Sequence, residues 1–350
     1  YLTNQMQFEN LNNLKVGVVI LNYNGCQYLE KFIPILLTTT YPNYFILVYD
    51  NNSTDGSEAY ISGIPEIRWG RNKTNDGYAQ GYNMAIEYCE DCDYLVLLNS
   101  DVEITANWLE PLIELMNKNE HLGACQPKIL SYNEPTYFEY AGAAGGWIDM
   151  LGYPFCRGRI VKNIEKDYGQ YNDATEIFWA SGAAFCIKKE LFTKMGGFDA
   201  LFFAHHEEID LCWRLQLSGY KIMVCPQSVV FHVGGGTLPV SPHKLFLNHR
   251  NNLIVLIKNL SFFQKLFLLP IRVIADFCIS LTYLFKLQYN LFIAVYRAYF
   301  AVILLVLQGK IIQTKNVRKI SELSGVYKGS LIAAYYVMAK KTFPKLIPKN

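Results

Sequence analysis

The sequence predicts an α/β fold, in which a mixed, mostly parallel sheet with helices on both faces precedes a C-terminal helical region. Three observations predict it. Apolar, β-rich runs alternate with helix-like stretches between residues 15 and 118. Polar residues stand at the ends of three of these runs. Residues 240–350 carry 16 Lys and Arg and 2 acidic residues, which leaves 16 basic and 28 acidic residues in front of them.

The first part of the chain supplies the sheet. We expect strands at 15–21, 45–50, 66–69 and 94–99 and helices at 26–39, 56–62, 78–89 and 107–118. Strands joined by helical crossovers run parallel, and ligands of such sheets gather where the strands end. The polar residues at three of these ends are Asn22 and Asn24, Asp50 and Asn52, and Asn99 and Asp101. Because parallel strands end on the same edge, we expect these side chains to face one cleft.

The later part of the chain has a more mixed pattern. Residues 131–175 are rich in Tyr, Gly and Asn, which indicates loops with short strands. The elements expected after them are strands on either side of Ser181-Gly182, an amphipathic helix at 207–219 and strands at 220–226 and 228–233. The glycine-rich stretch 234–239 is predicted to be a hinge or lid.

The chain divides into three predicted segments, which are an N-terminal extension at 1–14, the α/β domain at 15–240 and a basic, amphipathic helical region at 241–350. Successive helices are expected from about 244 to 340. Arg297 interrupts the most apolar stretch, and no charge-free run reaches the ~18 residues of a spanning helix. We therefore predict helices that lie in a membrane interface. A helical bundle against the first domain or another subunit, and a spanning or re-entrant pair, stay open.

Seven motifs carry a resemblance to a known family. They are VVILNYNG (18–25), VYDNNSTDGS (48–57), NDGYAQGYN (75–83), LLNSDV (97–102), WASGA (179–183), GGFDALFFAHHEEIDLCWR (196–214) and FHVGGGTL (231–238). Together they resemble the inverting family 2 glycosyltransferases with a GT-A fold, in particular rhamnosyltransferase-like enzymes of bacterial surface polysaccharide assembly. The resemblance makes 15–240 the GT-A catalytic domain and implies a nucleotide-sugar donor.

The resemblance implies where the donor binds. It assigns the donor to the strand ends and to the loop that enters the helix at 78–89, with these residues: Asn22, Asn24, Asp50, Asn52, Asn75, Gly77, Asn83, Asn99 and Asp101. A carboxylate such as Asp50 accepts a hydrogen bond from uracil or thymine N3–H or from a ribose hydroxyl. A helix N-terminus favours phosphate.

The resemblance also implies a divalent metal, Mg²⁺ or Mn²⁺. A departing nucleoside diphosphate gains negative charge, which a bound cation neutralises. The family's acidic DxD motif is replaced here by Asn99-Ser100-Asp101, so Asp101 alone can act as an anionic ligand. His232, in FHV, stands where the family places a second ligand.

Inversion requires a general base that deprotonates the acceptor hydroxyl. The resemblance places it in Glu207-Glu208-Ile209-Asp210, with Glu208 as the base and Glu207 beside it. An acidic helix start exposed to solvent is the alternative. Trp179, Gly182 and Asp210 are assigned to the acceptor side; Trp179 can instead be packed in the core, and Asp210 can pair with Arg214.

These features predict a metal-dependent, inverting hexosyltransferase. It would move rhamnose or another hexose from a dTDP- or UDP-sugar to a glycan or lipid-linked acceptor in surface polysaccharide synthesis. An odd number of cysteines, mostly in apolar runs, indicates reduced thiols and a cytoplasmic protein, here peripheral at the inner face of the cell membrane. A non-catalytic nucleotide-sugar-binding or scaffold subunit of an assembly complex is the alternative. No nucleic-acid partner is expected, and a homo-oligomer stays open.

Overall fold

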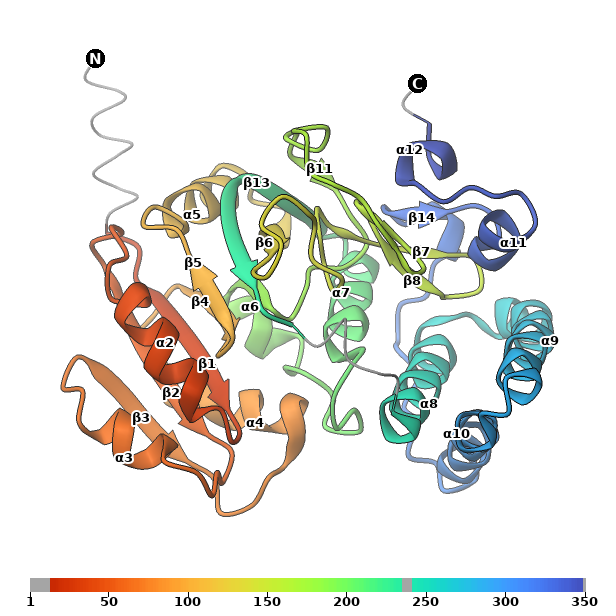
Figure 1. Cartoon of the computed structure of the whole chain (residues 1–350), viewed down its shortest axis with the longest axis horizontal. Helices are drawn as coiled ribbons and strands as arrows, with labels where there is room; N and C mark the ends of the chain where they lie inside the picture. Colours follow the sequence, from red (N-terminus) through yellow and green to blue (C-terminus); the bar gives the residue numbers. More distant parts are fainter. Residues whose placement is uncertain (1–12, 235–240, 349–350) are drawn as a thin grey trace.

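The computed structural model describes residues 13–234 and 241–348. A large sheet with its helices occupies one side of the molecule, and a smaller sheet lies beside it (Figure 1). Three long helices group together at the end of the molecule farthest from the first strands, and the chain then returns to the small sheet.

Nine strands form the large sheet in the described residues. They are β1 (Val16–Asn22), β2 (Tyr44–Asp50), β3 (Ile67–Arg71), β4 (Tyr94–Asn99), β5 (Val102–Ile104), β6 (Leu122–Ser131), β11 (Thr175–Glu176), β12 (Ala184–Lys188) and β13 (Lys221–His232). The order is β11-β13-β6-β12-β4-β1-β2-β3, and β5 pairs with β13. The long pairings β1–β2, β1–β4, β2–β3 and β6–β13 are parallel, whereas β12 is antiparallel to both of its neighbours. The predicted mixed, mostly parallel sheet is confirmed.

The three polar strand ends lie side by side, as their position in the sequence predicts. Asn22 pairs in register with Asp50, and Asp50 with Arg71 on the next strand. On the other side of β1, Leu21 pairs with Asn99. The residues that follow these strands therefore share one edge of the sheet.

Helices cover both faces of the sheet because the central strands are apolar on both sides. The helices are α2 (Cys26–Leu36), α3 (Ser57–Ser62), α4 (Gly77–Ile86), α5 (Leu109–Lys118), α6 (Lys189–Lys194) and α7 (Glu207–Leu217). Val18 and Ile20 belong to the hydrophobic cluster that includes the buried residues of α2 and α5. Val19, between them, belongs to the cluster of α4 and α7. This alternation is that of a strand buried on both faces.

Several strands differ from the prediction. The strand expected just before Ser181-Gly182 is reduced to a single bridge between Trp179 and Gly146, and the short strand β5 was not expected. β6 was not expected, because Gln126 and Lys128 interrupt its apolar run, yet both side chains are buried. β13 is one strand where two were expected. Its pairing with β6 shifts register between Cys225 and Val229, around Pro226, so a bulge replaces the expected break.

The small sheet takes its strands from both halves of the chain. Its order is β10-β9-β8-β7-β14, with β7 (Gly146–Asp149), β8 (Pro154–Cys156), β9 (Arg159–Ile160), β10 (Asn163–Ile164) and β14 (Val326–Tyr327). β14 pairs parallel with β7. Gly325, just before β14, adopts φ +71°, and a Cβ there would lie 2.1 Å from the backbone nitrogen of Phe178. The C-terminal segment is thus fitted against the first domain.

The C-terminal region begins with three helices, α8 (Pro242–Asn259), α9 (Phe262–Phe285) and α10 (Tyr289–Leu307). The expected run of helices to about 340 is wrong beyond Leu307. That part holds a 3₁₀ turn (Ile320–Glu322), β14, α11 (Leu331–Tyr336) and α12 (Phe343–Leu346). Its apolar residues, such as Leu331 and Phe343, pack in the core of the first domain. Of the predicted hinge or lid, residues 235–239 lie outside the described residues.

Within the described residues, α9 and α10 are long and apolar enough to cross a membrane, by length and composition. The expectation that no charge-free run reaches that length holds, because Arg272 and Asp276 interrupt α9 and Arg297 interrupts α10, but a few charged residues do not offset the apolar ones. The buried side chains of α9 are Arg272, Asp276 and Ser280. This helix therefore turns polar groups inward and leaves most of its large apolar side chains exposed.

Candidate active site

One cavity of about 370 Å³ collects most of the predicted catalytic and metal-binding residues. The predicted residues that line it are Asn99, Asp101, Trp179, Gly182, Glu207, Glu208 and His232. They come from the carboxyl ends of β4 and β13, the segment before β12 and the start of α7. Residues more than 130 positions apart in the sequence therefore face a common space.

Glu207 and Glu208 are the first two residues of α7, and Glu207 is buried whereas Glu208 is half-buried. Each has one carboxyl oxygen, Oε2, that is buried without a hydrogen-bond partner. Burial raises the pKa of Glu208 to about 7. Burial also raises the pKa of Glu207, and the neighbouring charge of Glu208 raises it further. A carboxyl group poised near neutral pH beside a cavity suits a general base, and a solvated helix start is excluded.

A strained turn places these two carboxyl groups. His205 and His206 both have φ +73°, in the left-handed region that non-glycine residues seldom adopt. Asn251 of α8 is fully buried and donates hydrogen bonds to the carbonyl oxygens of Ala204 (2.8 Å) and His205 (2.7 Å). The C-terminal region therefore fixes the turn that enters α7.

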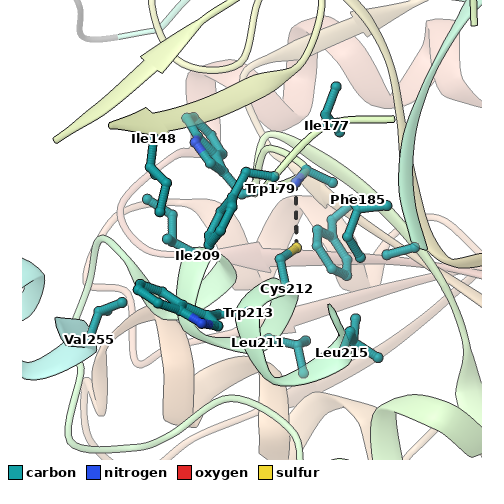
Figure 2. Close-up of a cluster of buried hydrophobic side chains, with 14 of the residues drawn as sticks. Ile148, Ile177, Trp179, Phe185, Ile209, Leu211, Cys212, Trp213, Leu215 and Val255 are labelled. Carbon is teal, nitrogen blue, oxygen red and sulfur yellow. Dashed lines mark hydrogen bonds between the residues drawn. The ribbon is translucent and has the colours of Figure 1, made fainter. Parts of the chain in front are cut away.

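The opposite face of α7 is packed into the core. Figure 2 shows Ile209, Cys212 and Trp213 among the buried apolar side chains around Trp179. The backbone nitrogen of Ala180 donates a hydrogen bond to Cys212 Sγ at 3.4 Å. This packing holds the helix, and hence its first two residues, against the segment that carries Trp179.

Asp101 and His232 form a contact pair on the cavity wall. His232 Nε2 lies 3.1 Å from Asp101 Oδ1, and its other ring nitrogen, Nδ1, lies 3.6 Å from Glu139 Oε1. Asn99 Nδ2 is 3.4 Å from His232 Nε2. Burial opposes a charge on His232, but the two carboxylates outweigh it and raise the pKa of His232 to about 10. The imidazolium therefore occupies a place that favours a cation.

The donor set at this place fits a cation that is shared with a ligand. Within the described ranges, no three His, Cys, Asp or Glu side chains are arranged to hold a metal ion. Asp101 and His232 supply one carboxylate and one imidazole, a pair that suits Mn²⁺ when diphosphate oxygens and water complete the shell. Glu139 Oε1 faces the other ring nitrogen of His232 at 3.6 Å, beyond hydrogen-bond distance, and acts on the ring through its charge.

The expected acceptor residues differ in their surroundings. Trp179 is 4% exposed, and its indole N–H donates a hydrogen bond to the carbonyl oxygen of Trp147 at 3.1 Å. It is thus packed in the core while one part of it lines the cavity. The Gly182 carbonyl oxygen accepts a hydrogen bond from the hydroxyl of Tyr78 at 2.7 Å.

Asp210 does not belong to this wall. Its side chain is fully buried and binds Arg214 Nε (2.9 Å), Lys258 Nζ (2.9 Å) and Asn259 Nδ2 (2.9 Å). Burial alone would raise the pKa of Asp210, but these partners hold it below the usual range, so the carboxylate is ionised. The assignment of Asp210 to the acceptor is therefore wrong, and the residue instead joins α7 to α8.

The predicted nucleotide residues at β1 and β2 lie outside the cavity. The Asp50 carboxylate is 1% exposed and accepts hydrogen bonds from Asn22 Nδ2 (3.0 Å) and from the Ser53 backbone nitrogen (2.8 Å). Asn24 Oδ1 accepts from the Thr54 backbone nitrogen (2.8 Å). Of the polar strand ends that we expect to face one cleft, only Asn99 and Asp101 line this cavity. The role of this edge in binding the nucleotide stays a prediction.

The loop that enters α4 also satisfies its own polar groups. Asn75 Oδ1 accepts from Asn51 Nδ2 (2.9 Å) and from the Gly77 nitrogen (3.0 Å). A Cβ on Gly77 would lie 2.3 Å from the Phe203 carbonyl oxygen, so the close approach made here is to protein. Asn83 Nδ2 donates to the Phe198 carbonyl oxygen (2.7 Å), and Asn83 Oδ1 accepts from the Phe198 backbone nitrogen (2.9 Å). Gly77 and Asn83 therefore pack against the 196–206 segment, whereas Asn75 holds the loop itself together. Asn52 Oδ1 accepts a hydrogen bond from Arg71 Nη2 at 3.3 Å.

Comparison with known proteins identifies the family. The sequence pattern of the family described as "Glycosyl transferase family 2" matches residues 17–196, about half of the chain. The chain belongs to glycosyl transferase family 2. The match includes the strand ends and the Asn99-Ser100-Asp101 motif, and it stops before α7.

Curated relatives of this family 2 chain include rhamnosyltransferases. N-acetylglucosaminyl-diphospho-decaprenol L-rhamnosyltransferase of Mycobacterium tuberculosis is 26% identical over 233 residues, which cover 61% of this chain and 75% of the relative. Rhamnosyltransferase WbbL of Escherichia coli is 24% identical over 227 residues, 62% of this chain and 83% of the relative. These matches make the chain rhamnosyltransferase-like.

A solved structure supports the fold of this family 2 chain. The crystal structure of GalNAc-T7 with UDP, GalNAc and Mn²⁺ superposes with a TM-score of 0.57 at 18% identity. The superposition covers 72% of this chain and 49% of the other chain. The expected GT-A fold is confirmed.

Several residues of the cavity were not expected from the sequence. They are Tyr78, Glu139, Tyr140, Arg159, Lys244 and Asn248. Glu139, Tyr140 and Arg159 lie in the segment predicted as loops with short strands, where no local pattern marks them. Lys244 and Asn248 are one turn apart on α8, a spacing that predicts a shared face but not which face.

Proposed function

We propose that the protein transfers rhamnose or another hexose, with inversion, from a dTDP- or UDP-sugar to a glycan or lipid-linked acceptor. The observation that carries this proposal is the cavity in which Glu208 faces the same space as the Asp101–His232 pair. The Mycobacterium relative, whose name specifies a lipid-diphosphate-linked acceptor, supports the acceptor class. We further propose a place in cell-surface polysaccharide synthesis at the cytoplasmic face of the membrane, which suits the lipid-linked substrate in the name of the Mycobacterium relative.

In this mechanism Glu208 removes the proton of the acceptor hydroxyl as that oxygen attacks the anomeric carbon. Its raised pKa matches the task, because a base that titrates near neutral pH accepts a proton readily and is still partly ionised. Glu207, held protonated beside it by burial and by the charge of Glu208, can donate a hydrogen bond in the same cavity. The packed Trp179 side chain limits the space for the acceptor ring.

Asp101 and His232 would hold the divalent cation, Mg²⁺ or Mn²⁺, that such a reaction uses. When bound, the cation supplies charge neutralisation to the departing nucleoside diphosphate. Asp101 contributes the anionic oxygen, and His232 the imidazole nitrogen that faces it. Asn99, whose Nδ2 lies 3.4 Å from the same nitrogen, contributes no charge, so this chain relies on Asp101 where DxD enzymes have two acids.

A panel of nucleotide sugars tests this function. We expect the purified chain to release dTDP or UDP from one donor class with Mn²⁺ or Mg²⁺, to be faster with an acceptor glycoside, and to stop with EDTA. Turnover is measured by nucleotide release and by product mass. Calorimetric binding of a nucleotide sugar without turnover on any acceptor would support the non-catalytic subunit instead. If the chain showed no binding of any nucleotide sugar and no turnover, both functions would be overturned.

The C-terminal helices support a membrane surface as the place of action. Exposed apolar side chains run along α9 and α10, among them Phe262, Phe263, Phe267, Ile274, Phe300, Ile303 and Leu307. The orientation of α9 is fixed from inside, because Arg272 donates to Asp276 (2.9 Å) and to the carbonyl oxygen of Leu151 (2.7 Å). Tyr153 donates to the same carboxylate at 2.6 Å. With the +14 excess charge of residues 240–350, this face suits an anionic bilayer.

Vesicle flotation tests this surface. We expect the protein to float with vesicles that contain phosphatidylglycerol and to bind phosphatidylcholine vesicles less, since charge contributes to the attraction. Replacing Phe267 and Phe300, which are 67% and 63% exposed, by Glu should reduce the bound fraction by about tenfold or more. The matched control is Tyr168→Glu, a 79% exposed aromatic on the first domain. A concentration-dependent dimer without vesicle binding would assign the face to a second copy.

A further inference from the structure

We infer that the cavity contains a subsite for a phosphate or diphosphate group of the acceptor, formed by Arg159 and Lys244. This inference rests on the proposed function, because it specifies the chemistry of the acceptor. Both residues line the cavity that holds Glu208.

Arg159 is a buried cation without a carboxylate partner. It lies in β9, is 6% exposed, and donates from Nε to the Tyr140 carbonyl oxygen at 2.9 Å. Its terminal nitrogens reach the Val161 carbonyl oxygen at 3.4 Å and Cys156 Sγ at 3.3 Å. None of these acceptors is charged, and Arg159 makes no ion pair among the described residues.

The guanidinium of Arg159 has donors to spare. A guanidinium carries five N–H groups, and three contacts leave two of them for a ligand in the cavity. Burying a charge without a counter-charge is unfavourable, which is why such groups are usually paired. Glu139 favours the charged form from beyond ion-pair distance, and it already lies beside His232. An anionic ligand would supply the missing partner, and a planar fork suits phosphate oxygens.

Lys244 supplies a second cation to the same cavity. It lies in the first turn of α8, where its backbone nitrogen is bonded to Ser241 Oγ at 3.1 Å, and it makes no ion pair among the described residues. Asn248 lines the cavity one turn further on. The start of α8 therefore presents a positive charge and an amide donor toward the cavity, together with the positive end of an 18-residue helix.

The position of this pair favours the acceptor over the donor. Arg159 belongs to the small sheet and Lys244 to α8, which adjoins α10 and its apolar face, whereas Asp101 and His232 lie at the ends of strands of the large sheet (Figure 1). A sugar linked through diphosphate to a lipid would have its sugar near Glu208, its diphosphate near these cations and its lipid toward the apolar helices. The donor diphosphate is the other anion that these cations could contact, and the test separates the two.

Calorimetry with farnesyl diphosphate tests the subsite in the full-length protein saturated with UDP and Mn²⁺. We expect binding that weakens by about tenfold or more in Lys244→Gln and in Arg159→Gln, since a charge-assisted hydrogen bond is lost in each. Farnesol should bind weakly and alike to every variant, and inorganic pyrophosphate should compete with farnesyl diphosphate. The matched control is Lys194→Gln, an exposed lysine of α6.

The measurement of UDP affinity makes the outcomes distinct. Unchanged UDP affinity together with weakened farnesyl diphosphate binding supports the subsite. Unchanged farnesyl diphosphate affinity in both variants overturns it, and an equal loss of UDP affinity assigns the cations to the donor. Because Arg159 is buried, the fold of Arg159→Gln is compared with that of the unmodified protein by circular dichroism and melting temperature. Lys244 is only half-buried, so Lys244→Gln decides the outcome if Arg159→Gln fails to fold. The same titrations are made with dTDP if UDP does not bind, and failure of the proposed function would show instead as absent binding of both nucleotides to the unmodified protein.

Discussion

Replacing Glu208 by Gln is expected to lower kcat by about 10²- to 10⁴-fold while the affinity for the donor changes little. Gln keeps the size of the side chain and the start of α7 but cannot accept the proton of the acceptor hydroxyl. The contacts proposed for the nucleotide lie at other residues, so calorimetry with the nucleotide sugar should give a similar dissociation constant. Nucleotide release and product formation measure the loss of turnover.

The pH profile gives the same residue a second signature. Because the base acts when ionised, kcat/KM, which reports the ionisation of the free enzyme, should rise with pH through a value near 7, well above the usual range of a glutamate, and fall away as the solution becomes acidic. Folding favours the protonated form, so the stability that Glu208 contributes is present at low pH and is lost as pH rises through its folded pKa. Glu208→Gln cannot ionise, and its melting temperature at pH 8 should equal or exceed that of the unmodified protein.

A matched control separates chemistry from helix stability. Glu190 is the second residue of α6 as Glu208 is of α7, but it is exposed. Glu190→Gln should retain normal turnover and the normal pH profile. Normal turnover in Glu208→Gln would remove this residue from the role of base, and a lowered melting temperature at pH 8 would contradict the account of its burial.

Strong local patterns explain what the sequence could predict. A carboxylate or amide directly after a buried strand has its position fixed by the backbone, so the alignment of Asn22, Asp50 and Asn99 followed from parallel pairing alone. Asp101, Glu208 and His232 lie in motifs that the family shares, and all three reach the cavity. The strands and the helix that position these residues have long apolar patterns, from which the elements can be predicted.

Long-range partners explain what the sequence could not predict. Whether a carboxylate faces a cavity or a cation depends on residues far along the chain, and Asp210 was misplaced because Lys258 reaches it from α8. Arg159 acquires its place from pairings of very short strands, which leave little periodicity to detect. Glu139 lies outside the strands, where its backbone nitrogen donates to the Ile129 carbonyl oxygen at 3.1 Å. In α9 the polar side chains of Arg272 and Asp276 are buried while most apolar side chains are exposed, and composition alone cannot show which side of a helix is covered.

Replacing Asp101 by Asn is expected to abolish tight Mn²⁺ binding in the presence of UDP and to reduce kcat/KM by about 10²-fold or more. Asp101 is the anionic member of the Asn99-Ser100-Asp101 motif, and its amide replacement leaves His232 without the carboxylate 3.1 Å away. Neutralisation of the leaving diphosphate by the cation is worth several kcal/mol. Asn99 and Ser100 carry no charge, so they cannot hold the cation in place of Asp101. Titration of Mn²⁺ followed by electron paramagnetic resonance measures the binding directly, independently of turnover.

The control for this variant lies two residues along the chain. Glu103 on β5 makes no ion pair among the described residues, and Glu103→Gln should leave Mn²⁺ binding and kcat/KM unchanged. UDP binding measured in EDTA should be the same in Asp101→Asn as in the unmodified protein, because the cation is then absent from both. If Asp101→Asn retained metal-stimulated transfer, the cation would have to be held elsewhere, and the pairing of Asp101 with His232 would then serve only to join β4 to the end of β13.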